Sequence, residues 1–267
     1  MPRCGIVIPI RLASERLPGK ALTDVAGRPA LHHLLDRAAA SRFVAPKDVV
    51  VCTTREGSDD ALVTAVEACG ASVYRGETDD LIARFSGAVA AFGFEFVVEM
   101  DGDDLCCATE YVDLCFERLL ADPATDVVVC EGLPLGIAPR GFTRQAMARV
   151  NYHYRSIEND TGFFHLFTKT GLCQVATVNP VSDTHLHDAA RLTLDYEEDL
   201  EFFRALLTGL GTPGAPASLE AVIAHLRQHH ELVEINRKMN DAFWQRTAEK
   251  VKLSYADAAG QIRSIGQ

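Results

Sequence analysis

Short apolar runs alternate with helix-like segments through the first half of the chain, and this alternation constrains the fold more than any other feature. Strand-like runs occur at 4–10, 49–54, 72–74, 94–100 and 126–131. Between them apolar residues recur at helical spacing, as at Leu31, Leu34, Leu35 and Ala38. This order is typical of parallel strands with helices on both faces. We therefore predict an α/β fold with a doubly wound, mainly parallel sheet.

The pattern weakens in the second half. Over 134–190 histidines, aromatic residues and turn residues replace regular periodicity, and we interpret this region as an inserted lid. A strand is predicted at 191–194, ending at Asp195, and Thr78, Thr109 and Ser218 are predicted helix caps. We assign one domain to 1–240 and a helical tail to 241–267.

Composition excludes several classes of protein. The 267 residues suffice for one sizeable α/β domain. The 37 acidic residues outnumber 26 basic ones, and a general nucleic-acid binder would show the opposite balance. No apolar run approaches the roughly 20 residues that cross a bilayer, and the N-terminus lacks secretory features. The eight cysteines follow no metal-type spacing, so we expect a cytoplasmic protein with reduced thiols.

A cationic segment follows the first predicted strand. Arg11, Arg16 and Lys20 lie within ten residues of an otherwise acidic chain, together with Ser14 and Gly19, which suit a turning backbone. Such a loop can hold a polyphosphate through backbone N–H groups and cationic side chains. Neither the Walker A nor the G-x-G-x-x-G spacing is present. A solvated loop is the alternative, but its place at a strand's carboxyl end favours a ligand site.

Carboxylates follow two other predicted strands. The run from Asp101 to Asp104 ends one of them, and Asp195 ends another. Clustered carboxylates gain from a hard cation such as Mg²⁺ bound with phosphate oxygens. For the first run, the alternative is an acidic turn that caps the next helix. For Asp195, it is a favourable interaction with the N-terminus of the following helix. If both sites bind one cation, Asp103 and Asp195 must converge in the fold.

The cationic segment, Arg11-Leu-Ala-Ser-Glu-Arg-Leu-Pro-Gly-Lys20, resembles the R-x-x-S-x-R-L-P-G-K signature of sugar-type cytidylyltransferases. This group includes the CMP-3-deoxy-manno-octulosonate and CMP-sialate synthetases and the spore-coat polysaccharide biosynthesis protein F family, which the chain resembles most. The similarity continues in order along most of the chain, at 27–29, 53–54, 79–85, 102–103, 191–200 and 232–236.

The resemblance implies a Rossmann-like nucleotidyltransferase fold and an enzyme that uses CTP and Mg²⁺, joins CMP to an acceptor and releases pyrophosphate. It implies catalytic roles for Arg11, Lys20 and Asp103 and metal binding by Asp103 and Asp195. The implied nucleotide-binding residues are Ile10, Arg11, Leu12, Ala13, Ser14, Arg16, Lys20, Thr54, Arg84, Asp101 and Gly102.

The acceptor is left open, because the chain departs from its relatives at Asp104-Leu105 and over 158–164. We expect a small anionic acceptor: an acidic sugar, a sugar or polyol phosphate, or a phosphonate. Candidate residues for binding it are Arg140, His153, Glu158 and His165, and Arg144 and Lys169 are further cations that could bind an anionic acceptor.

Other functions remain to be weighed against this one. A nucleotidyltransferase that uses another nucleotide such as GTP is one, and a nucleotide-binding regulator without catalysis is another, although the retained Asp103 and Asp195 argue against it. A dinucleotide-dependent dehydrogenase is disfavoured by the missing glycine fingerprint. Related synthetases are often dimers, so the 241–267 tail is a candidate homodimer interface.

Overall fold

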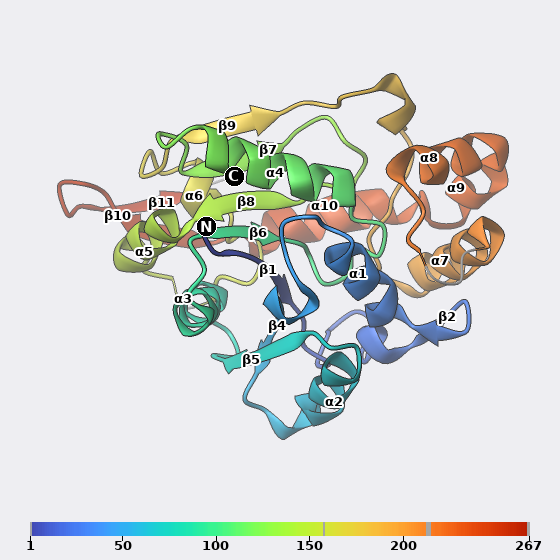
Figure 1. The fold of residues 1–267 in the computed structure, drawn as a ribbon, viewed down its shortest axis with the longest axis horizontal. Helices are drawn as coiled ribbons and strands as arrows, with labels where there is room; N and C mark the ends of the chain where they lie inside the picture. Colours follow the sequence, from blue (N-terminus) through green and yellow to red (C-terminus); the bar gives the residue numbers. More distant parts are fainter. Residues whose placement is uncertain (1, 157, 212–214, 266–267) are drawn as a thin grey trace.

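A computed structural model of the chain describes residues 2–156, 158–211 and 215–265. Its centre is a seven-stranded sheet of order β5-β4-β1-β6-β8-β7-β9 (Figure 1). The strands are β1 (Cys4–Pro9), β4 (Val49–Thr54), β5 (Ser72–Gly76), β6 (Phe96–Glu99), β7 (Val127–Cys130), β8 (Arg140–Thr143) and β9 (Val175–Val178). Within this sheet β8 is antiparallel to both neighbours, and the remaining pairs are parallel. The predicted mainly parallel sheet is confirmed.

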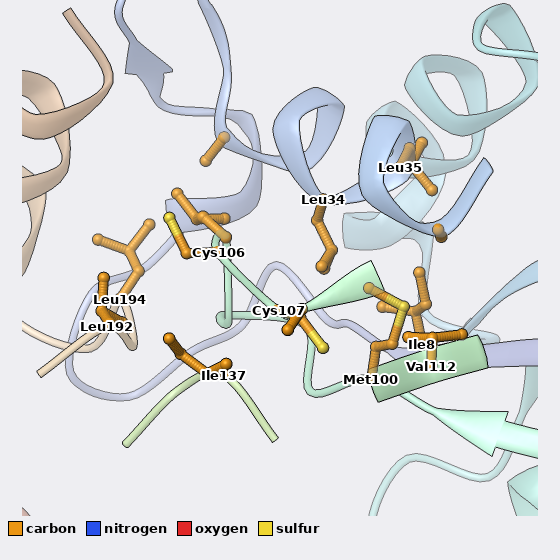
Figure 2. Close-up of a cluster of buried hydrophobic side chains, with 14 of the residues drawn as sticks. Ile8, Leu34, Leu35, Met100, Cys106, Cys107, Val112, Ile137, Leu192 and Leu194 are labelled. Carbon is orange, nitrogen blue, oxygen red and sulfur yellow. The ribbon is translucent and has the colours of Figure 1, made fainter. Parts of the chain in front are cut away.

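Helices cover both faces of the sheet. They are α1 (Ala30–Ala39), α2 (Asp60–Ala68), α3 (Leu81–Phe92), α4 (Thr109–Ala121), α5 (Arg144–His153) and α6 (His165–Thr168). Along β1 the side chains alternate: Ile6 and Ile8 pack in the core with α1 and α4, whereas Val7 packs with α3 and α5. Figure 2 shows part of the first cluster, including Ile8, Leu34 and Val112. Two buried layers, one on each face, are what a doubly wound sheet requires.

Helix ends follow local capping chemistry. Asp80, and not the predicted Thr78, caps α3 by accepting a hydrogen bond from the Ala83 amide at 2.9 Å, because its carboxylate directly precedes the helix. Ser218 caps its helix as predicted. Thr109 begins α4 and its hydroxyl donates instead to the Arg37 carbonyl at 2.9 Å, so Ala108 occupies the cap position.

The region predicted as an inserted lid, 134–190, is built into the sheet. It contains β8 and β9 as well as α5 and α6. Histidines and aromatic residues interrupt the sequence periodicity here because several of them pack around short elements, as Phe163, Phe164 and Phe167 do under α5.

The prediction of a regular strand at 191–194 is wrong. Its one ladder contact is an isolated parallel bridge between Leu135 and Arg191. The Leu192 amide donates to the Leu135 carbonyl at 2.8 Å, whereas the Leu194 amide donates to the Asp103 carbonyl at 2.9 Å. The segment is extended and buried but divides its hydrogen bonds between two partners, so no regular strand forms. The second of these bonds brings Asp195 to Asp103.

Four helices follow: α7 (Glu197–Leu210), α8 (Leu219–Gln228), α9 (His230–Asn236) and α10 (Met239–Lys250). The predicted helical tail is helical only as far as Lys250. An antiparallel hairpin of β10 (Leu253–Ala256) and β11 (Ile262–Ile265) comes next, because Leu253 and Ile265 pair and bury their side chains in the α3–α5 core. Figure 1 shows this hairpin beside α5, where Tyr154 and Tyr255 form a bridge.

A small ribbon of β2 (Asp24–Val25) and β3 (Arg28–Pro29) and four 3₁₀ turns complete the regular structure of the described residues. The turns are Lys20–Leu22, Pro46–Asp48, Gly57–Asp59 and Asp183–His185. None of the helices resolved in these ranges combines the length and the apolar character needed to cross a membrane.

Candidate active site

A cleft of about 940 Å³ opens where β1 and β6 end. This is the edge at which parallel α/β sheets bind ligands. The predicted residues that line it are Ile10, Arg11, Ser14, Arg16, Lys20, Arg84, Asp101, Gly102, Asp103, Arg140 and His165. Eight of the 26 lysines and arginines of this acidic chain line the cleft, so positive charge is concentrated where an anion would enter.

The cationic loop and the two aspartates meet at Lys20. Gly19 adopts φ 73°, a left-handed conformation that favours glycine, and its amide donates to the Leu12 carbonyl at 2.9 Å. The turn directs the Lys20 ammonium to Asp103 Oδ2 at 2.7 Å and to Asp195 Oδ1 at 3.2 Å. The predicted convergence of these two aspartates is confirmed, across 92 positions of sequence.

Asp195 is held from both sides. Arg16 donates to its Oδ1 atom, and the buried Arg191 donates to Oδ2 at 3.0 Å. The carboxylate itself is only 1% exposed. The Arg16 guanidinium also stacks over the Tyr196 ring, 5.3 Å from its centroid. Asp195 itself does not line the cleft: these contacts hold its carboxylate behind Arg16 and Lys20, which do.

Burial and charge oppose each other at this centre. Burial alone would lower the pKa of Lys20, but the charges of Asp103 and Asp195 raise the pKa above its ordinary value, so the ammonium stays charged. Burial and the charge of Asp103 raise the pKa of Asp195. The two carboxylates therefore repel each other, and a cation between them relieves the repulsion.

Gly102 is required by close packing. A Cβ atom here would lie 2.3 Å from the Pro9 carbonyl oxygen, at the end of β1. The absence of a side chain lets the turn from Asp101 to Asp103 approach the strand and places Asp103 beside the loop. Asp101 itself is paired with Arg140, whose other nitrogen lies 3.3 Å from the buried Glu99.

Arg11 and Arg84 lie together elsewhere along the cleft. The Arg84 guanidinium donates to the carbonyls of Glu77 at 2.7 Å and Thr78 at 2.6 Å. Arg11 reaches the same Thr78 carbonyl at 3.4 Å and pairs with Asp160 at 2.8 Å. Both cations therefore border the N-terminus of α3.

Thr54, Leu12 and Ala13, predicted nucleotide ligands, do not line the cleft. Thr54 is 1% exposed, and its hydroxyl donates to Asp59 Oδ2. The Leu12 amide donates to the other oxygen of the same carboxylate at 2.8 Å. Thr54 and the Leu12 amide therefore share the Asp59 carboxylate. Through this shared partner Thr54 helps to position the cationic loop against β4, although Thr54 itself does not line the cleft.

We expect Asp59→Ala to lower the free energy of unfolding by about 2 kcal/mol at pH 7, because buried donors lose their acceptor. Burial would raise the pKa of Asp59, but hydrogen bonds from Thr54 and the Leu12 amide lower it. The contribution is therefore present above the unfolded-state pKa near about 4 and is lost as the pH falls.

Urea unfolding of both proteins from pH 7 to pH 3 measures this. The stability gap should narrow below about pH 4. The control is Asp60→Ala, which removes an exposed carboxylate paired with Arg75 and should cost at most about 1 kcal/mol. A gap that widens on acidification would contradict the assignment.

The four residues first named as candidates for binding the acceptor fall into two groups. Arg140 and His165 line the cleft, whereas His153 and Glu158 do not. The His153 Nδ1 atom lies 2.7 Å from the Ala256 carbonyl, against the terminal hairpin, and Glu158 is exposed outside the cleft. The charge of Arg140 is matched by Asp101 and Glu99. Burial lowers the pKa of His165, which is therefore neutral at pH 7.

Sequence reasoning missed the contribution of α10. Its residues Phe243, Trp244, Arg246, Thr247 and Lys250 line the cleft. Four of them stand at i, i+3, i+4 and i+7, which places them on one helix face. That spacing was visible in the sequence, but nothing there indicates which element the face contacts.

A cationic loop joined to paired aspartates, at the carboxyl edge of a doubly wound sheet, defines the nucleotidyltransferase class of enzyme. A sequence profile of the cytidylyltransferase family matches residues 5–204. The chain belongs to the cytidylyltransferase family.

Relatives and solved structures agree with this. The chain is 34% identical over 120 residues to the 3-deoxy-manno-octulosonate cytidylyltransferase of Geobacter sulfurreducens, covering 44% of this chain and 46% of that protein. It thus spans about half the length of such relatives. An uncharacterised protein of Methanocaldococcus jannaschii is 26% identical over 201 residues, covering 75% of this chain and 81% of the relative.

Two solved structures share the fold. A cytidylyltransferase from Leptospira borgpetersenii aligns with a TM-score of 0.79 at 23% identity, covering 87% of this chain and 97% of that one. A CMP:2-keto-3-deoxy-manno-octonic acid synthetase complexed with CTP aligns with a TM-score of 0.60 at 19% identity, covering 78% and 99%. These matches concern the family as a whole, and membership of the spore-coat group stays a prediction.

Proposed function

We propose that the protein is a Mg²⁺-dependent cytidylyltransferase that transfers CMP from CTP to a small anionic acceptor and releases pyrophosphate. The observation that carries the proposal is the convergence of Asp103 and the buried Asp195 on Lys20, which lines the cleft together with Asp103. The choice of CTP is supported by the family match. Acidic sugars are the first acceptors to test, because the named relatives act on 3-deoxy-manno-octulosonate.

The carboxylate pair fits a magnesium ion. Two hard oxygen donors face one position, which the Lys20 ammonium takes in this structure, and the repulsion between them favours a cation beside them. In the ranges that the structure describes, no cluster of three or more potential protein ligands occurs. Mg²⁺ commonly takes one or two carboxylates and completes its shell with phosphate oxygens and water. Asp103 and Asp195 would hold the ion, which when bound would neutralise charge on the α-phosphate.

The reaction needs positioning and charge neutralisation more than covalent chemistry. An acceptor oxygen forms a bond to the α-phosphorus, and the bond from that phosphorus to the bridging oxygen breaks. The electron pair of that bond leaves with pyrophosphate. Arg11, Arg16 and Lys20 would stabilise the triphosphate and the departing pyrophosphate. A carboxylate or phosphate acceptor arrives ionised, so no protein base is required.

Lys169 is a cation available to the acceptor. It lines the cleft, is exposed, and forms no ion pair with any other residue in the described part of the chain. Arg140 is already paired and His165 is neutral, so neither adds free positive charge. Recognition of the acceptor anion is therefore assigned to Lys169, with Phe163 and Phe164 forming an apolar wall beside it.

A pyrophosphate-release screen tests the proposal. All four ribonucleoside triphosphates are combined with acidic sugars, sugar and polyol phosphates and phosphonates, with and without Mg²⁺. We expect release with CTP, one acceptor class and Mg²⁺ together. Pyrophosphate release with GTP but not with CTP would show that GTP is the nucleotide substrate. CTP binding without turnover on the whole panel would indicate a regulator, and turnover unaffected by a chelator would contradict the metal assignment.

A further inference from the structure

The C-terminal helix α10 (red in Figure 1) lies outside residues 5–204, which match the family, yet forms part of the cleft. Its cleft-lining face carries Phe243, Arg246, Thr247 and Lys250. Two cations one turn apart on a helix face can bind one anionic group together. The residues that match the family profile end before this helix.

Arg246 and Lys250 both bind Glu15. The Lys250 ammonium lies 2.9 Å and 2.8 Å from the two carboxylate oxygens, and Arg246 donates to Oε2. Glu15 is the one acidic residue of the ten-residue cationic loop. A side-chain carboxylate from the middle of an anion-binding loop therefore occupies the two cations of α10.

The helix that carries the two cations has a second contact besides Glu15. Phe243, one turn before Arg246, lies under two guanidinium groups: that of Arg191 at 4.8 Å and that of Arg16 at 5.9 Å from the ring centroid. Arg191 is fully buried. This stack packs α10 against the Asp195 network, so the helix has contacts besides those with Glu15.

The ion pairs of Glu15 with Arg246 and Lys250 are exposed enough for another anion to replace Glu15. The side chains of Glu15, Arg246 and Lys250 are 57%, 33% and 37% exposed. Ion pairs this exposed contribute little to stability and are readily replaced by a more highly charged anion. A phosphate group carries more charge and more acceptor oxygens than a carboxylate.

We propose that Arg246 and Lys250 bind the pyrophosphate leaving group and that Glu15 occupies their site in its absence. The proposal rests on the proposed function. In-line displacement puts the leaving group opposite the acceptor. The loop that contains Arg16 and Lys20 holds the leaving side, and α10 touches that loop through Glu15.

Inorganic pyrophosphate is the probe, and Trp244 reports its binding. Trp244 is the single tryptophan of the chain, lines the cleft and is 56% exposed. Its fluorescence is titrated with pyrophosphate, with and without Mg²⁺, in the full-length wild type, Arg246→Ala/Lys250→Ala and Glu15→Gln. Arg237→Ala is the matched control, because Arg237 is an exposed arginine just before α10 and its ion pair is with the exposed Glu234.

We expect the double variant to weaken pyrophosphate binding about tenfold to a hundredfold, since two charged hydrogen-bonding groups are lost. Glu15→Gln should tighten binding about threefold or more, because the competing charge is gone. With CTP and acceptor, the double variant should raise the KM for CTP and leave the KM for the acceptor unchanged. Arg237→Ala should match the wild type.

Unchanged pyrophosphate binding in the double variant would overturn the inference, as would an effect on the acceptor KM alone. Weaker binding in Glu15→Gln would also overturn it, because Glu15 would then be a structural tie. A wild type that binds pyrophosphate but turns over no nucleotide would instead count against the proposed function, so the two failures are distinguishable.

Discussion

Lys20→Ala and Asp103→Asn are each expected to reduce kcat/KM for CTP by about a thousandfold, the scale seen when a preorganised charge at a phosphoryl or acyl transfer site is removed. Lys20 is the one side chain that contacts both Asp103 and Asp195 in the residues described. Its loss removes positive charge from the triphosphate and leaves two adjacent carboxylates. Asp103→Asn keeps the shape of the side chain and removes half of the proposed metal-binding pair.

Steady-state pyrophosphate release measures the effect, and thermal unfolding separates it from misfolding. Asp103→Asn should keep its melting temperature near that of the wild type, because Lys20 still bonds Asp195 and the Leu194 carbonyl. Lys238→Ala is the matched lysine control, since its partner is the half-buried Glu198, which does not line the cleft. If both site variants keep most of their activity while folded, the central assignment is wrong.

The sequence was informative where one local pattern decides the outcome. Apolar runs of strand length and helical spacing predicted β1, β4, β5 and β6, because buried parallel strands are apolar throughout. It was also informative at strand ends, where topology brings side chains to one edge. The convergence of Asp103 with Asp195 follows from that rule, even though the segment before Asp195 is not a regular strand.

Sequence reasoning failed where a residue acts through a partner distant in the chain. Thr54 carries a family motif, yet its role is to bind Asp59, which holds the loop at Leu12. His153 was a reasonable anion ligand by type, but the terminal hairpin takes its ring nitrogen. Neither partner can be identified from spacing, because neither lies on the same helix face or strand edge.

Two motif segments at 191–200 and 232–236 are explained by one contact. Asn236, on α9, donates to Asp199 Oδ1 at 2.9 Å and to the Arg191 carbonyl at 3.0 Å. Asp199 also accepts the amides of Asp195 and Tyr196 at 2.9 Å and 3.0 Å. The two segments therefore form a rigid support behind Asp195. Their match to the family motif can be seen in the sequence, but this supporting role cannot.

Arg191→Ala tests this support and is expected to lower the free energy of unfolding by about 3–5 kcal/mol. Arg191 is fully buried and forms a two-point ion pair with Asp199 at 2.9 Å and 3.0 Å, besides its bond to Asp195. Removing it leaves the buried Asp199 without a counter-charge and takes one of three cationic partners from Asp195. Breaking a buried pair costs far more than the pair contributes, because the remaining charge cannot return to water.

Urea denaturation at pH 7 measures the loss, and the exposed pair in Arg237→Ala, worth at most about 1 kcal/mol, is the control. A loss below about 1 kcal/mol for Arg191→Ala would mean that the support is dispensable. If the support is needed, activity under folding conditions must also fall, because Asp195 then keeps Lys20 and Arg16 but loses the partner that fixes its second oxygen. The stability of the fold and the catalytic activity therefore both depend on the Asp195 carboxylate. Arg16 and Lys20 of the cationic loop bind it on one side, and the buried Arg191 binds it on the other.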